Sequence, residues 1–278
     1  MSTALDWAGK SGDSWADRWR DTDRALAGLA LVLDAQLVKA ARDGPFRSLD
    51  VGCGHGSTSL ALAAARPDAA IVGCDLSAAL LEVARTRAEG LPGVRFVLGA
   101  AEGVASAEGP FDLIFSRHGV MFFADPVDAY TKLRQAAAPG ASFIFSCFQS
   151  WQANPWASEL AAAASGTPLP APGREPSGFA FAEPAYVEGI LHASGWTDAC
   201  LSPVPFRYVA GEGGQPVDKA LSFLAEIGPA SRVLKELAHT DQHAALQRMR
   251  GVLERYRRDD RIEFPAAAWI WRATSSGA

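Results

Sequence analysis

The chain has 278 residues, a formal net charge of −5 and hydrophobic side chains at 49% of its positions. This length and apolar content suit one large domain or a core domain with a modest cap, and they exclude general disorder. The mild acidity argues against nucleic acid as a partner. The longest apolar stretch, 25–41, is interrupted by Asp34 and Lys39, so it falls short of the roughly 20 apolar residues of a membrane span.

The first residues and the cysteines together predict a cytoplasmic protein. The charged residues near the start leave no apolar core for a signal peptide; they are Asp6, Lys10, Asp13 and Asp17. The cysteines contain no Cys-x-x-Cys pair, so we expect neither a metal site nor a disulfide framework. They are Cys53, Cys74, Cys147 and Cys200.

Helices and strands alternate along the chain as far as Phe148. The first 45 residues are predicted to be helical, with an apolar stripe at steps of three and four. The predicted strands are Ser48 to Val51, Ala70 to Asp75, Val94 to Leu98, Phe111 to Phe115 and Ser142 to Phe148. The predicted helices between them are Ser57 to Ala65, Ala78 to Glu89, Glu102 to Ala105 and Pro126 to Ala137, and a turn is predicted at Pro139-Gly140. Because the strands are continuous apolar runs, we predict a parallel sheet with both faces covered by helices.

The alternation weakens after Phe148. The predicted elements there are a helix from Ala153 to Ala164, a proline-rich loop from Thr167 to Gly178, a helix from Pro184 to Ser194, a strand from Leu201 to Val209, a helical pattern from Val217 to Arg258 and a strand from Ala267 to Ala273. We interpret the helical pattern between the last two strands as an insertion or cap rather than an independent domain.

A glycine cluster follows the first predicted strand and opens a helix. It reads Asp50-Val51-Gly52-Cys53-Gly54-His55-Gly56. Glycines allow a ligand close to the backbone, and a helix N-terminus offers free N–H groups to negative charge. Asp75, 19 residues after Gly56, ends the next strand, where an acid can accept both hydroxyls of a ribose. The alternative role for Asp75 is an N-cap for the following helix, which Ser77 could serve equally well.

This stretch closely resembles the D-x-G-x-G-x-G motif of class I S-adenosylmethionine-dependent methyltransferases. A dinucleotide fingerprint, G-x-G-x-x-G, would place its third glycine one residue later. Three further segments resemble that family in order: Gly73 to Ser77, Phe111 to Ser116 and Ala138 to Ala141. The run Phe115 to Pro126 further resembles a bacterial small-molecule branch related to the ubiquinone and menaquinone methyltransferases.

The resemblance implies an α/β fold with a doubly wound, mostly parallel, seven-stranded sheet, an N-terminal helical lid and a helical cap insertion. It divides the chain into a lid (1–45), an S-adenosylmethionine-binding core (46–150) and a substrate-pocket region (151–278). The implied cofactor-binding residues are Trp15, Trp19, Asp50, Gly52, Cys53, Gly54, Gly56, Asp75, Leu76, Ala101, Glu102, Ser116 and Arg117. Ala100-Ala101 stands where many members carry Asp-Ala, so Glu102 would either meet the adenine amine or cap a short helix.

The expected activity is methyl transfer from S-adenosylmethionine to a small organic acceptor. His118 is the best candidate for a base, and a structural histidine bonded to backbone is the alternative. Arg117 would bind an acceptor carboxylate or serve as a plain ion-pair partner. Apolar residues would shape a pocket for a hydrophobic or aromatic acceptor, or belong to the ordinary core; they are Trp151, Trp156, Phe179 and Phe181.

We favour O-methylation over N- or C-methylation by a monomer or homodimer. The two other functions to be tested are an NAD(P)-dependent oxidoreductase and a non-catalytic S-adenosylmethionine-binding protein. His239 and His243 have helical spacing but lack the glutamate of the metalloprotease pattern. The arginines from Arg248 to Arg261 alternate with acids, as on a charged helix surface.

Overall fold

The computed structural model describes residues 7–276. The strands are β1 (Phe46–Val51), β2 (Ala69–Asp75), β3 (Val94–Leu98), β4 (Phe111–Arg117), β5 (Ala137–Phe148), β6 (Trp196–Glu212), β7 (Arg257–Arg258) and β8 (Arg261–Ser275). The helices are α2 (Lys10–Asp17), α3 (Trp19–Ala40), α4 (Ser57–Ala65), α5 (Ala78–Arg87), α6 (Ala101–Glu108), α7 (Pro126–Gln135), α8 (Pro155–Ser165), α9 (Pro184–Ala193), α10 (Pro216–Glu226), α11 (Pro229–Glu236) and α12 (His239–Arg255). Two 3₁₀ turns are η1 (Val120–Phe122) and η2 (Trp151–Ala153). The start of the predicted lid, including Asp6, lies outside the described residues.

The strands form one sheet in the order β3-β2-β1-β4-β5-β8-β6, and β7 pairs with β8 off this path. Strands β1 to β5 are parallel, whereas β8 runs antiparallel to both β5 and β6. The chain order reverses at β1, which lies between β2 and β4. This is the predicted Rossmann-like fold with a mostly parallel sheet, and ligands of such sheets bind at the carboxyl ends of the strands near the reversal.

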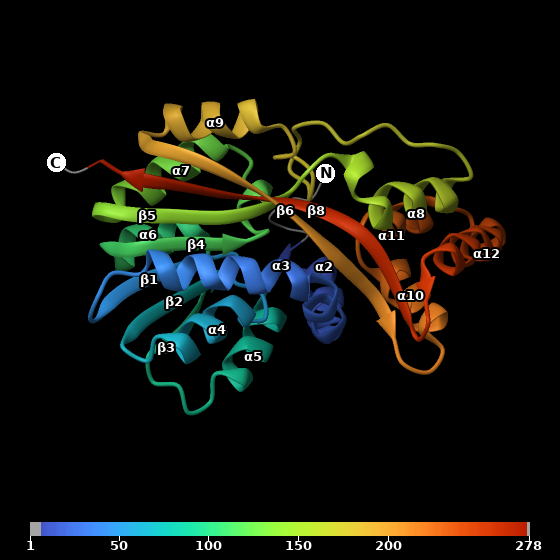
Figure 1. Cartoon of the computed structure of the whole chain (residues 1–278), viewed down its shortest axis with the longest axis horizontal. Helices are drawn as coiled ribbons and strands as arrows, with labels where there is room; N and C mark the ends of the chain where they lie inside the picture. Colours follow the sequence, from blue (N-terminus) through green and yellow to red (C-terminus); the bar gives the residue numbers. More distant parts are fainter. Residues whose placement is uncertain (1–6, 277–278) are drawn as a thin grey trace.

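Helices cover both faces of the sheet (Figure 1). Alternate residues of β5 supply the two cores, because successive side chains of a strand point to opposite faces. Ile144 packs with the buried leucines of α3, among them Leu29 and Leu33, whereas Phe143 and Phe145 pack with α6, α7 and α9. No helix among residues 7–276 is long and apolar enough to cross a membrane.

Local sequence signals place several helix starts where they were predicted. Ser77 caps α5 by accepting a hydrogen bond from Leu80 N at 3.2 Å, and Asp125 caps α7 through Asp128 N at 3.0 Å. Helices α7 to α11 each carry a proline in their first turn, where the missing N–H costs nothing.

Three predicted segments differ in detail from the structure. The N-terminal helical stretch is divided at Arg18 into α2 and α3, and residues 41–45 are not helical. The helical pattern from Val217 to Arg258 is three helices, interrupted at Gly228 and Ala238, followed by β7. The turn predicted at Pro139-Gly140 lies inside β5, where the register against β4 shifts.

The cap insertion packs on a projection of the sheet. Strands β6 and β8 extend together beyond the parallel strands, and α8, α10, α11 and α12 gather around their far ends (Figure 1). Two arginines tie the N-terminal helices to this region. Arg24 donates to the Val209 and Ala210 carbonyls of β6 at 3.1 and 2.7 Å, and Arg18 pairs with Glu226 of α10.

Candidate active site

The glycine loop between β1 and α4 lies at the carboxyl ends of the parallel strands. Gly52, Gly54 and Gly56 have φ values of 64°, 54° and 82°, a region that side chains rarely adopt. A Cβ on Gly56 would also come within 2.8 Å of Phe96, whereas no described atom lies within 4 Å of a Cβ built on Gly54. The backbone at Gly54 is therefore open to close approach by a ligand.

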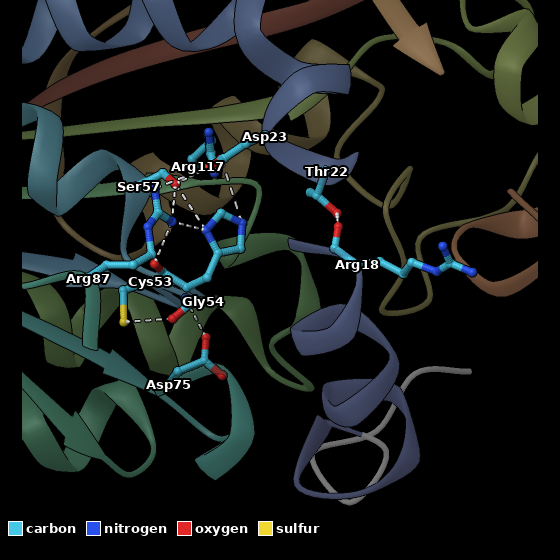
Figure 2. Close-up of polar contacts among 10 residues, drawn as sticks. Arg18, Thr22, Asp23, Cys53, Gly54, Ser57, Asp75, Arg87 and Arg117 are labelled. Atoms are coloured by element: carbon cyan, nitrogen blue, oxygen red, sulfur yellow. Dashed lines mark hydrogen bonds and ion pairs between the residues drawn. The ribbon is translucent and has the colours of Figure 1, made fainter. Parts of the chain in front are cut away.

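Asp75 ends β2 beside this loop. Its Oδ2 accepts a hydrogen bond from Gly54 N at 2.8 Å (Figure 2). Its Oδ1 accepts a hydrogen bond from Ser77 N at 2.9 Å. Burial raises the pKa of Asp75, against the opposing effect of the hydrogen bonds from Ser77, Gly54 and the half-buried Leu76. Since Ser77 caps α5, Asp75 is not needed as the cap. Each carboxylate oxygen keeps capacity for a further donor.

Asp50 and Cys53 lie inside the protein beneath the loop. Asp50 accepts a hydrogen bond from Ser59 Oγ at 2.7 Å, and burial raises its pKa to about 7 despite that bond. Cys53 N donates to the Cys74 carbonyl at 3.0 Å, and burial raises the pKa of the Cys53 thiol. Both residues hold the shape of the loop, and the side chain of Asp50 is only 1% exposed.

Five polar side chains from five separate segments meet beside the loop. Asp23 of α3 accepts hydrogen bonds from Ser57 Oγ at 2.6 Å, Arg117 at 3.0 Å and Arg87 at 3.3 Å (Figure 2). Arg87 also donates to His55 Nδ1 at 2.9 Å. Burial alone would raise the pKa of Asp23, but electrostatic interaction with His55 and Arg117 and the bond from Ser57 hold it below its ordinary value. Burial and the charge of Arg117 lower the pKa of His55 to about 4.

Asp23, Ser57 and Arg87 were not among the site residues predicted from the sequence. Each is a single polar residue on a helix, and only the docking of α3 on the glycine loop brings them together. The sole local hint is that Ser57 directly follows the last glycine.

Trp19, a predicted cofactor-binding residue, lies against this network. Its ring is held between the guanidinium groups of Arg20 at 4.3 Å and Arg87 at 4.2 Å, and its centroid lies 5.8 Å from that of His55. Trp19 therefore helps to dock α3 on the glycine loop.

Helix α2 lies directly over the end of β2. A Cβ on Gly12 would meet Ser77 Oγ at 2.4 Å, so the two segments are in close contact. Trp15, the other predicted tryptophan, packs edge-on against Trp7 at 5.7 Å, and Trp7 packs on Phe122 of η1 at 5.0 Å. These contacts place the N-terminal helices as a cover over the strand ends.

The remaining predicted cofactor residues lie on neighbouring segments of the same edge. The buried Ser116 hydroxyl donates to the Val51 carbonyl at 2.6 Å and accepts from Gly119 N at 3.0 Å, so it joins the ends of β1 and β4. Ala101 and Glu102 form the first turn of α6, whose N-cap residue makes no side-chain capping bond.

His118 stands in a strained turn after β4. Its φ is 61°, its Nδ1 lies 2.8 Å from Ser146 Oγ, and its ring packs edge-on against Phe148 with centroids 4.1 Å apart. Burial, and then the charge of Arg117, lower the pKa of His118 to about 3. The neighbouring Arg117 is the ion-pair partner of Asp23.

An aromatic cluster continues from Phe148. Phe179 stacks on Phe148 at 5.4 Å, Trp156 lies 5.1 Å from Phe148, and Trp151 packs edge-on against Phe179 at 5.1 Å. Phe181, which was grouped with them, packs instead in the core on the opposite face of the sheet.

Comparison with known proteins identifies a methyltransferase domain within the chain. Residues 49–140 match the family model described as a methyltransferase domain. Trans-aconitate 2-methyltransferase of Methylobacterium radiotolerans is 34% identical over 104 residues, which are 37% of this chain and 38% of that protein. Demethylmenaquinone methyltransferase of Thermus thermophilus is 35% identical over 115 residues, 41% of this chain and 50% of that protein. The matches thus span half or less of these two relatives.

Solved structures match over much more of the chain. The YcgJ protein of Bacillus subtilis superimposes with a TM-score of 0.56 at 18% identity, covering 89% of this chain and all of that one (100%). A phosphoethanolamine N-methyltransferase of Haemonchus contortus, solved with S-adenosyl-L-methionine, gives a TM-score of 0.52 at 16% identity, covering 96% of this chain and 60% of that one.

The segment from 49 to 140 is thus a class I methyltransferase domain, of the branch that includes small-molecule methyltransferases. It forms the centre of a Rossmann-like methyltransferase fold.

Proposed function

We propose that the protein transfers a methyl group from S-adenosylmethionine to an oxygen of a small, hydrophobic or aromatic acceptor. The observation that carries this proposal is the fixed carboxylate of Asp75 beside the open backbone of the glycine loop. Two backbone N–H groups orient the carboxylate, and its remaining acceptor capacity suits the two hydroxyls of a ribose.

The residues around Asp75 fit a nucleoside with a charged sulfonium. Gly54 admits close contact with the backbone, and Ala101 and Glu102 flank the neighbouring strand end where an adenine would lie. Trp15 offers aromatic surface, which attracts cations by about 0.5–2 kcal/mol, whereas the ring of Trp19 is already in contact with the guanidinium groups of Arg20 and Arg87. The remaining predicted cofactor residues, including Leu76 and Ser116, would contact the cofactor through backbone or maintain the shape of this edge.

Catalysis of methyl transfer depends mainly on the positioning of the methyl donor and acceptor and on the exclusion of water. When bound, S-adenosylmethionine supplies a methyl whose bond to sulfur breaks as its bond to the acceptor oxygen forms; the electron pair stays on sulfur and a hydroxyl proton leaves to solvent. The docked α2 and α3 helices would shield this reaction from water. The network around Asp23 would hold α3 in that position.

The acceptor region is proposed to lie between His118 and the aromatic cluster that begins at Phe148. Phe148, Trp156 and Phe179 form an apolar cluster next to the imidazole of His118. The names of the relatives, trans-aconitate 2-methyltransferase and demethylmenaquinone methyltransferase, include both a carboxylate and a quinone-type acceptor. The aromatic surroundings of His118 favour the second type.

Calorimetric titration with S-adenosylhomocysteine tests the cofactor site. We expect binding to the wild type and at least tenfold weaker binding to Asp75→Ala, because one charge-assisted hydrogen bond is worth about 1.5–3 kcal/mol and 1.4 kcal/mol is tenfold. Asp128→Ala, an acid exposed on α7, is the matched control and should bind like the wild type.

An affinity of Asp75→Ala within about twofold of the wild type would contradict the proposed ribose contact. Binding of NAD(P) in place of S-adenosylhomocysteine would point to an oxidoreductase. Tight S-adenosylmethionine binding without turnover over a broad panel of acceptors would point to a non-catalytic binding protein.

A further inference from the structure

The turn after β4 has a strained backbone at His118, and the turn lies against the glycine loop through Gly119. His118 has a φ of 61°, a left-handed conformation that is unfavourable for a residue with a side chain. The next residue, Gly119, is pressed on the loop: a Cβ there would lie 2.6 Å from the Val51 carbonyl oxygen and 3.0 Å from Gly52 Cα. Backbone strain at such a position indicates that the side chain has a functional role there.

The two ring nitrogens of His118 have different surroundings. Nδ1 lies 2.8 Å from Ser146 Oγ. Nε2 is buried and has no hydrogen-bond partner within residues 7–276. Leaving a buried polar atom unpaired is unfavourable, and such atoms are few in folded proteins. Nε2 is therefore a buried donor or acceptor without a partner, on a ring that packs edge-on against Phe148.

Ser146 determines which nitrogen carries the proton. Ser146 is 0% exposed, and within the described part of the chain its hydroxyl contacts only His118 Nδ1. A neutral imidazole has one N–H. If Nδ1 carried it, both the serine hydrogen and Nε2 would lack a partner. If Nδ1 is unprotonated and accepts the hydrogen bond from Ser146, only the Nε2–H lacks a partner. This second arrangement leaves fewer polar groups unpaired and is therefore favoured.

We propose that His118 is a neutral hydrogen-bond donor, whose Nε2–H holds an oxygen of the methyl acceptor, and that Ser146 is the positioning residue that sets this tautomer. This inference rests on the proposed function and defines its acceptor more closely. The role of hydrogen-bond donor assigned to His118 differs from the role of base expected from the sequence.

The same contacts define the class of acceptor. A neutral N–H provides one hydrogen bond and no charge, and Arg117, the cation beside it, is already paired with Asp23 at 3.0 Å. Phe148 carries the apolar surface onward to Phe179. The site therefore suits a phenol or a ring carbonyl on an aromatic frame, rather than a carboxylate.

The charge state of His118 supports a donor at neutral pH. Burial lowers its pKa, and the positive charge of Arg117 lowers the pKa further. A ring that stays neutral from about pH 5 to about pH 8 cannot be the group whose deprotonation switches activity on in that range.

The first test is nitrogen NMR of the free protein labelled with ¹⁵N-histidine, with His118→Gln used to assign the signal. We expect the neutral Nε2–H tautomer throughout about pH 5 to about pH 8, and a mixture of tautomers in Ser146→Ala. A proton on Nδ1, or a titration within that range, would overturn the proposal. This result does not depend on methyl transfer, so it can fail or succeed independently of the proposed function.

The second test uses phenol and toluene as probes, which differ by the oxygen that the donor would hold. The ratio of phenol to toluene affinity should fall about three- to tenfold in His118→Phe, and should be maintained in His118→Gln, which keeps a donor. An unchanged ratio in His118→Phe would show that the Nε2–H does not hold the oxygen. Benzoate binding that exceeds phenol binding would contradict the assigned acceptor class.

Discussion

The contact between the N-terminal helices and the glycine loop depends on one carboxylate, that of Asp23. It accepts hydrogen bonds from three side chains that belong to the methyltransferase core, Ser57, Arg87 and Arg117. Replacing Asp23 by alanine removes all three hydrogen bonds at once. It leaves Arg117, whose side chain is only 10% exposed, without its carboxylate.

The size of the effect follows from this burial. Breaking a fully buried ion pair costs about 3–5 kcal/mol, and surface pairs contribute about 0–1 kcal/mol. Because the Asp23 side chain is 24% exposed, we expect Asp23→Ala to lower the free energy of unfolding by about 2–3 kcal/mol. Urea unfolding with linear extrapolation measures this change.

A double-mutant cycle separates the ion pair from the other contacts of Asp23. Arg117→Met should also destabilise the protein, and the double variant should be less destabilised than the sum, with a coupling of about 1–3 kcal/mol. Asp128→Ala, which breaks an exposed pair on α7, is the control and should cost less than about 1 kcal/mol. A loss below about 0.5 kcal/mol in Asp23→Ala would refute the role given to this network.

Three further predictions concern the strand ends. Gly119→Ala should lose about 1–3 kcal/mol of stability in urea unfolding, because its Cβ would overlap the Val51 carbonyl, whereas Gly103→Ala has open space and should be neutral or stabilising. The pKa of His118 is lowered from 6.5 to about 3, so the unfolded state binds a proton first as pH falls. As pH falls from 6.5 to 5, the free energy of unfolding of His118→Phe should therefore decrease by about 2 kcal/mol less than that of the wild type. Equal decreases in the two proteins would contradict the burial of His118. The pKa of Asp50 is raised from 3.8 to about 7, so the wild type loses stability as pH rises through that window. Between pH 5 and 7 the free energy of unfolding of Asp50→Asn should rise by about 2 kcal/mol relative to that of the wild type. A difference that stays constant with pH would contradict this burial of Asp50.

The central strands were predictable because their signals are local. Val94–Leu98 has the predicted bounds, and Phe46–Val51 and Ala69–Asp75 begin only one or two residues earlier than expected. Each is an apolar run that a glycine or an acid terminates. The glycine loop and Asp75 were predictable for the same reason, since they follow directly from such runs.

The cap region was harder to predict because tertiary packing decides its element boundaries. Strand β6 extends to Trp196 and Glu212 although Pro203 and Pro205 lie within it. Prolines are tolerated there because β6 pairs with β8 at the edge of the sheet. Pro229, at the start of α11, was a local sign that the helical pattern after Val217 would be divided.

The polar networks of the site could not be predicted from local sequence. Asp23 and Arg117 are 94 residues apart, and Ser146 is 28 residues from His118. Neither pair has a spacing that repeats in the sequence. They meet because α3 packs across the sheet and because β4 and β5 are parallel neighbours.

The central claim is that Asp75 and the glycine loop hold S-adenosylmethionine. A crystal structure of the complex with S-adenosylhomocysteine tests it most directly. We expect both ribose hydroxyls within hydrogen-bond distance of the Asp75 carboxylate, with the nucleoside beside Gly54 and its sulfur directed toward the turn that carries His118. A ribose bound elsewhere, or a glycine loop that S-adenosylhomocysteine does not contact, would contradict it.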